Sequence, residues 1–117
     1  AVYPLSPAMI EATSGITKTI IDTPLWMILL TLAVLPAFCE EVAFRGFIFG
    51  GLIRQNGVLR AILVSALFFG LTHGVLQQSI SASFMGILLG WVAWRTGGIV
   101  CTIAMHLIHN SLSILLS

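Results

Sequence analysis

Four long apolar runs, separated by short polar breaks, dominate the sequence. The first follows Thr23-Pro24, a cap residue and a proline suited to the first helical position, and continues to about Ile53. The second run extends from Val58 to His73. The third begins near Ser79 or Ser81 and ends at Trp94-Arg95, and the fourth extends from Ile99 to Leu116. Their lengths are close to the roughly 17 to 25 apolar residues that cross a bilayer as a helix. The pattern therefore predicts an all-α, membrane-embedded bundle of about four transmembrane helices.

The polar breaks predict where these helices begin and end. Residues 54–57 read as a turn, Gly74 is expected to stop the second helix, and residues 96–98 separate the last two helices. Ser79 or Ser81 is expected to cap the third helix. The chain should therefore pass up and down through the bundle.

Residues 1–22 differ from the rest because they mix apolar and charged side chains. Ser6-Pro7 can begin a short helix, but the segment is too polar to span a bilayer. We expect residues 1–22 to be an interfacial or connecting segment, and residues 23–117 to form one membrane domain.

Composition supports a membrane protein. The chain is 58% hydrophobic and 8% charged, whereas a soluble domain is about 25% charged. A net charge of +1 from scattered basic residues gives no nucleic-acid footprint. Cys39 and Cys101 read as reduced core thiols. The chain begins at Ala1 with no initiator Met or leader pattern, so we expect it to belong to a longer parent chain with additional helices.

Arginines mark one side of the predicted bundle. Arg54, Arg60 and Arg95 fall in or beside the first and third connections, which an up-and-down path places together. Because positive residues favour the cytoplasmic side, we expect this end to be cytoplasmic, in a prokaryotic cell membrane. The lipid bilayer is then the first partner of the chain.

Three charges within the first apolar run are hard to explain by packing. Glu40, Glu41 and Arg45 lie in six consecutive residues, although a charge at mid-bilayer costs roughly 2.5 to 3.5 kcal/mol on insertion scales. Pro36 precedes Glu40 by four residues, so a kink or break beside the carboxylates is expected. The residues therefore predict a polar site inside the bundle.

Helical spacing separates the two glutamates. Glu41 and Arg45 are i,i+4 and should form an ion pair. Glu40 points about 100° away on the helix and is free to take a proton from water as a general base. The alternative is that Glu40 is a second partner of Arg45.

Ionisable groups on three helices share one depth. Glu40 lies 14 residues before Arg54, His73 lies 13 after Arg60, and His106 lies 11 after Arg95. At 1.5 Å per residue, these spacings are depths of about 17 to 21 Å from one surface. We therefore expect a common site.

The histidine helices offer further candidates. His73 follows Phe69 by four residues and is expected to be a second ligand for the water, unless it is an interfacial polar residue. His106 and Asn110 are i,i+4 and can donate hydrogen bonds to an oxyanion, unless they only bind neighbouring helices. His109 is expected to make an interhelical hydrogen bond. The phenylalanines are read mainly as core or lipid-facing aromatics, some of which could line a substrate groove.

In chain order these motifs, Glu40-Glu41-x-x-x-Arg45, Phe69-x-x-x-His73 and His106-x-x-x-Asn110, resemble the CPBP family of intramembrane proteases. This family contains type II CAAX prenyl endopeptidases and bacteriocin-processing relatives. The resemblance implies a glutamate-type intramembrane endopeptidase without a metal or other cofactor. Glu40 and His73 would activate water, His106 and Asn110 would hold the oxyanion, and Glu41 and Arg45 would support them.

The substrate implied is a membrane-associated peptide or protein, with or without a lipid group. Two other functions remain open. A zinc-dependent protease would use Glu40, His73, His106 and His109 as ligands, although no His-Glu-x-x-His motif is present. A non-enzymatic scaffold or immunity-type relative would use the buried charges only for helix packing.

Overall fold

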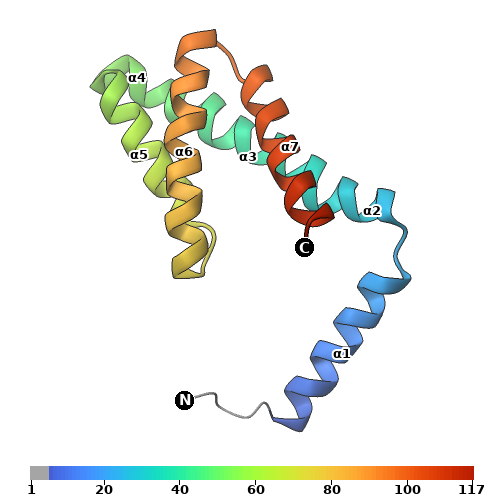
Figure 1. Cartoon of the computed structure of the whole chain (residues 1–117). Helices are drawn as coiled ribbons and strands as arrows, with labels where there is room; N and C mark the ends of the chain where they lie inside the picture. Colours follow the sequence, from blue (N-terminus) through green and yellow to red (C-terminus); the bar gives the residue numbers. More distant parts are fainter. Residues whose placement is uncertain (1–5) are drawn as a thin grey trace.

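The computed structural model describes residues 6–117, and within them the chain is helical with short connections (Figure 1). The first five residues of the predicted interfacial segment, including Pro4, lie outside the described residues. The helices in chain order are α1 (Pro7–Asp22), α2 (Leu25–Leu29), α3 (Leu35–Glu41), α4 (Gly50–Asn56), α5 (Val58–Leu71), α6 (Leu76–Thr96) and α7 (Val100–Leu115).

Helices α2, α3 and α4 form one continuous helix, Leu25–Asn56, because π-helical segments join them at Leu30–Val34 and Val42–Phe49. The break expected at Pro36 is therefore absent. Instead, the Leu35 N–H donates to the carbonyl of Leu30, five residues back. Proline lacks an N–H and crowds the carbonyl four residues earlier. A wider π turn just before Pro36 accommodates this loss without breaking the helix.

The membrane bundle is confirmed as the fold class. Leu25–Asn56 and Leu76–Thr96 are long and apolar enough to cross a membrane, whereas α5 and α7 are apolar but shorter. Many large apolar side chains are exposed, as expected for a surface that faces lipid. Of the four predicted membrane spans, two are therefore long and apolar enough to cross a membrane by themselves, and the two shorter helices pack against them.

Helices α5 and α6 form the most extensive contact in the bundle. Glycines permit their close approach. A Cβ on Gly86 would lie 2.9 Å from the Cα of Ala66, and one on Gly70 would lie 2.6 Å from the Ser79 carbonyl oxygen and also clash with Ser83 Oγ. Small residues at such positions let membrane helices pack backbone to backbone.

Helix α6 begins earlier than expected, and the prediction of a cap at Ser79 or Ser81 is wrong. The cap residue is Val75, and the Ser79 N–H already donates within the helix to the Val75 carbonyl. Gly74 does end the preceding segment, with φ of +71°. The tight turn brings α6 directly back against α5, so the contact at Gly70 selects the start of the helix rather than a serine cap.

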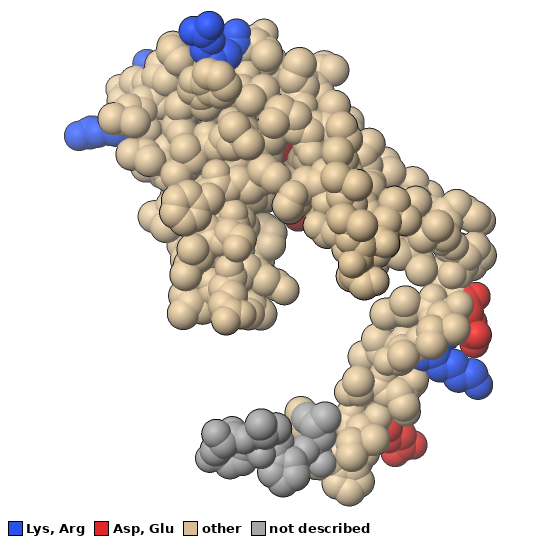
Figure 2. Space-filling model, in the orientation of Figure 1, with Lys and Arg blue, Asp and Glu red and all other residues tan. Residues whose placement is uncertain are grey.

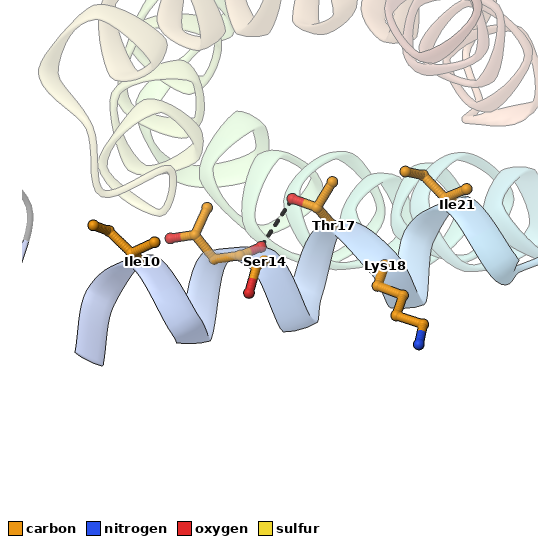
Figure 3. A pocket seen from close by; sticks show the side chains of 6 residues that line it. Ile10, Ser14, Thr17, Lys18 and Ile21 are labelled. Atoms are coloured by element: carbon orange, nitrogen blue, oxygen red, sulfur yellow. Dashed lines mark hydrogen bonds between the residues drawn. The ribbon is translucent and has the colours of Figure 1, made fainter. Parts of the chain in front are cut away.

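Helix α1 stands apart from the bundle (Figure 1) and has no buried residue. Its predicted start is confirmed, since Ser6 Oγ accepts a hydrogen bond from the Met9 N–H. Its charged side chains gather on one face (Figure 2). Figure 3 shows a depression lined by residues of α1 alone, with Ile10, Thr17 and Ile21 pointing to one side and Lys18 to the other. The interfacial role of this helix stays a prediction.

The two ends of the bundle differ in charge. Arg54 lies in the last turn of α4 and Arg95 in the last turn of α6, and Arg60 lies in the first turn of α5. Basic side chains accordingly gather at one end of the bundle (Figure 2). The expectation of core thiols is wrong, because Cys39 and Cys101 are free but exposed.

Candidate active site

Glu41 is the centre of a buried polar network. Its side chain is 0% exposed, and Oε1 accepts hydrogen bonds of 2.8 Å from both Arg45 Nη1 and His106 Nδ1. Arg45 Nη2 donates to the Gly86 carbonyl at 3.0 Å. The predicted Glu41–Arg45 ion pair is therefore present, and it also joins the first bundle helix to α6 and α7.

The bond between Glu41 and His106 fixes the imidazole. A carboxylate oxygen only accepts, so Nδ1 carries the proton and donates. This leaves Nε2 facing Glu40, whose Oε2 lies 3.6 Å away. That separation is longer than a hydrogen bond. His106 thus lies between the two adjacent carboxylates, held by one and close to the other.

The two glutamates have different surroundings, as their helical spacing predicts. Glu41 is fully buried, whereas the Glu40 side chain is 33% exposed. Arg45 pairs with Glu41, and no ion pair between Glu40 and Arg45 occurs in the described part of the chain. The alternative that Glu40 is a second partner of Arg45 is thereby disfavoured. Glu40 keeps a carboxylate available for other contacts.

His73 extends from the end of α5 and is half-buried. Its Nδ1 lies 2.9 Å from the Phe69 carbonyl oxygen. Because a carbonyl oxygen only accepts, Nδ1 carries the proton in this contact. In the neutral ring Nε2 is then an acceptor, suited to bind a water molecule.

Phe69 organises the site in a way that its sequence position did not reveal. Its ring centroid lies 4.6 Å from the Arg45 guanidinium carbon, 5.0 Å from the ring of His73 and 5.6 Å from that of His106. A second aromatic, Phe44, packs edge-on against it. Such contacts hold both imidazoles and the cation in place. The i,i+4 relation to His73 was the available signal, but the sequence did not predict contacts of this ring with Arg45 and His106.

A cavity of about 390 Å³ lies where α5, α6 and α7 meet, and His73, His106 and His109 line it. Its walls come from the end of α5, the first half of α6 and the second half of α7, and the lining residues are Phe69, His73, Gln78, Ser81, Ala82, Met85, His106, His109, Asn110 and Ser113. Three of the four predicted catalytic residues therefore share one cavity. Glu40 is not among the lining residues and approaches the cavity through its contact with His106.

The cavity belongs to an open hollow in the bundle. Figure 2 shows acidic atoms recessed in the surface of the bundle. Glu40 and Glu41 are the acidic residues of the bundle sequence. His73 and Gln78 flank the turn between α5 and α6, whereas Arg60 and Arg95 lie at the other ends of these helices. The hollow therefore opens toward the end of the bundle opposite the arginines.

His109 departs from expectation. Its side chain is exposed and lines the cavity, and among residues 6–117 it makes no interhelical hydrogen bond. The same residues contain no group of three or more His, Cys, Asp or Glu side chains arranged to hold a metal ion. The ligand set expected for zinc is therefore not assembled.

Comparisons with known proteins show which family the chain resembles. The sequence profile described as type II CAAX prenyl endopeptidase Rce1-like matches residues 22–112. The protein named Putative membrane peptidase YdiL, from Bacillus subtilis (strain 168), is 32% identical over 106 residues, which are 91% of this chain and 43% of that relative. The chain thus spans less than half the length of this relative. No solved structure matches the chain.

Proposed function

This chain belongs to the Rce1-like family of type II CAAX prenyl endopeptidases, and we propose that it is the catalytic part of an intramembrane endopeptidase that hydrolyses a peptide bond with a water activated by Glu40. The observation that carries the proposal is the division of the glutamates. One is fully buried in an ion pair, and its neighbour is one-third exposed beside an imidazole.

The first step assigned to this site is attack by water. Glu40 takes a proton from a water molecule, and His73 Nε2 helps to hold that water by accepting a hydrogen bond from its other O–H group. The resulting hydroxide adds to the carbonyl carbon of the scissile bond. Support for this pair comes from the partly exposed carboxylate of Glu40, which is not paired with Arg45, and from the His73 tautomer that the Phe69 carbonyl selects.

The second step is collapse of the tetrahedral intermediate. Asn110 and a doubly protonated His106 donate hydrogen bonds to the oxyanion, a contribution that typically changes kcat by about 10²–10³-fold per donor. Glu40 then returns its proton to the departing nitrogen as the C–N bond breaks. Glu41 acts through His106 by holding Nδ1, and Arg45 holds Glu41.

The substrate proposed is a membrane-associated peptide or protein segment, with or without a lipid group. The arginine-bearing end is proposed to be cytoplasmic under the positive-inside rule, and the protein to be integral to a prokaryotic cell membrane. Residues 23–117 carry the site, and residues 1–22 lie at the membrane surface. These assignments rest on composition and family membership.

The test is peptide hydrolysis in liposomes by the longest available parent protein. Glu40→Gln should abolish turnover without lowering the melting temperature, and Glu11→Gln, on the isolated α1, is the matched control and should be fully active. Unchanged activity in Glu40→Gln would refute the mechanism and favour the scaffold reading. Loss of activity with a zinc chelator, restored by zinc, would instead establish the metalloprotease.

A further inference from the structure

One wall of the cavity carries neutral polar groups that the proposed mechanism does not use. Gln78 and Ser81 lie three residues apart on α6, hence on one face of the helix, and both line the cavity opposite His106 and Asn110 of α7.

These two side chains keep their hydrogen-bonding groups free. Most hydroxyls on the helices bond back to their own helix, as Ser83 does to the Ser79 carbonyl and Ser113 to the His109 carbonyl. Among residues 6–117, Ser81 Oγ and the Gln78 amide make no such bond. Each can both donate and accept. Unused groups facing a cavity are available to a ligand.

The cavity contains no Asp, Glu, Lys or Arg among its lining residues. A peptide that enters it brings one backbone N–H and one C=O per residue. In surroundings with few polar groups, each of these must find a partner, since an unpaired amide is costly to desolvate. A wall that offers neutral donors and acceptors therefore fits the main chain of a peptide better than it fits a charged side chain.

We propose that Gln78 and Ser81 bind the backbone of the substrate, holding an extended, uncharged segment along α6 so that its scissile carbonyl meets His106 and Asn110. This inference rests on the proposed function. It assigns the two residues a positioning role and the substrate a class, namely a segment without charges next to the cleaved bond.

The chain offers a matched control in Gln77, the same residue type one position away and absent from the cavity lining. With a neutral peptide, Gln78→Ala should raise KM about 3- to 10-fold, the effect of one hydrogen bond, with little change in kcat. Ser81→Ala should act in the same direction, and Gln77→Ala should match the wild type. Melting temperatures should not change, because the Gln side chains are exposed.

Backbone recognition is tested directly with ester-substituted peptides, in which single substrate N–H groups are replaced by oxygen. At the peptide position whose N–H binds Gln78, the ester should weaken peptide binding to the wild type but should not weaken peptide binding to Gln78→Ala any further. Additive effects at every position, or equal KM values for Gln78→Ala and Gln77→Ala, would overturn the inference.

The same series is measured as peptide Kd in the Glu40→Gln background, which needs no turnover. If wild type and Glu40→Gln hydrolyse equally, the proposed mechanism fails, and the binding series still decides the role of Gln78. If hydrolysis depends on Glu40 but the Gln78 and Gln77 variants bind alike, only the inference of this subsection fails.

Discussion

Removing one charge from the Glu41–Arg45 pair should strongly destabilise the bundle, whereas removing both should destabilise it far less. Both side chains are 0% exposed and their closest atoms are 2.8 Å apart. With charge centres about 4 Å apart and an effective dielectric constant near 20, their attraction is about 4 kcal/mol. A single substitution leaves an uncompensated buried charge, which typically costs about 3–5 kcal/mol.

The double variant behaves differently because the pair is imperfectly satisfied. Glu41 Oε2 and Arg45 Nε are buried without a hydrogen-bond partner among the described residues, and each such atom costs about 1–3 kcal/mol. Replacing the pair with neutral side chains removes both buried charges together with their attraction, and Arg45→Met also removes the unpaired Nε. Glu41→Gln with Arg45→Met should therefore lose far less than the roughly 6–10 kcal/mol sum of the single variants.

The assay is equilibrium unfolding in mixed detergent micelles, measured for the wild type, both single variants and the double variant. Glu40→Gln is the control and should lose less than about 1 kcal/mol, because its side chain is partly exposed. If the losses of the two single variants sum to the loss of the double variant within about 0.5 kcal/mol, the two residues do not interact and the reasoning is refuted.

Two further predictions concern packing and orientation. Gly70→Ala should lower the unfolding free energy by about 1–3 kcal/mol, because its Cβ would overpack against the Ser79 carbonyl. Gly51→Ala is the control: nothing lies within 4 Å of its added Cβ, so it should be neutral or stabilising by up to about 1 kcal/mol. Equal losses in the two variants would contradict the contact between α5 and α6. In a background without native cysteines, Asn56→Cys and Thr72→Cys flank α5 and should react with an impermeant maleimide from opposite sides of sealed vesicles, Asn56→Cys from the cytoplasmic side; labelling from one side would exclude a spanning α5.

The one-dimensional pattern predicted most of the fold because apolar runs and glycine breaks are local signals. It placed the bundle helices and the turn at Gly74, and helical spacing alone paired Glu41 with Arg45. It missed the start of α6, where a tertiary contact outweighed a serine cap. It also missed the π turns, because a proline in a helical run predicts a lost hydrogen bond but not how the helix accommodates it.

Within the site, spacing predicted depth but not direction. Counting residues from the arginines placed Glu40, His73 and His106 at one level, yet rotation about each helix axis decides which atoms meet. The Glu41–His106 bond joins residues 65 positions apart and could not be read from either helix. The aromatic contacts of Phe69 and the free amide of Gln78 required the same three-dimensional information.

The short helices have a consequence for the surrounding lipid. Helix α5 has 14 residues and α7 has 16, so they are about 21 and 24 Å long, against a hydrocarbon core of about 30 Å. A hydrophobic mismatch of this size is relieved by thinning of the adjacent bilayer, at fractions of a kcal/mol per ångström. Under the proposed hydrolysis, thinning beside the hollow shortens the path of water to the site. Bilayer thickness then becomes a control on turnover, and vesicles of shorter acyl chains should give faster hydrolysis.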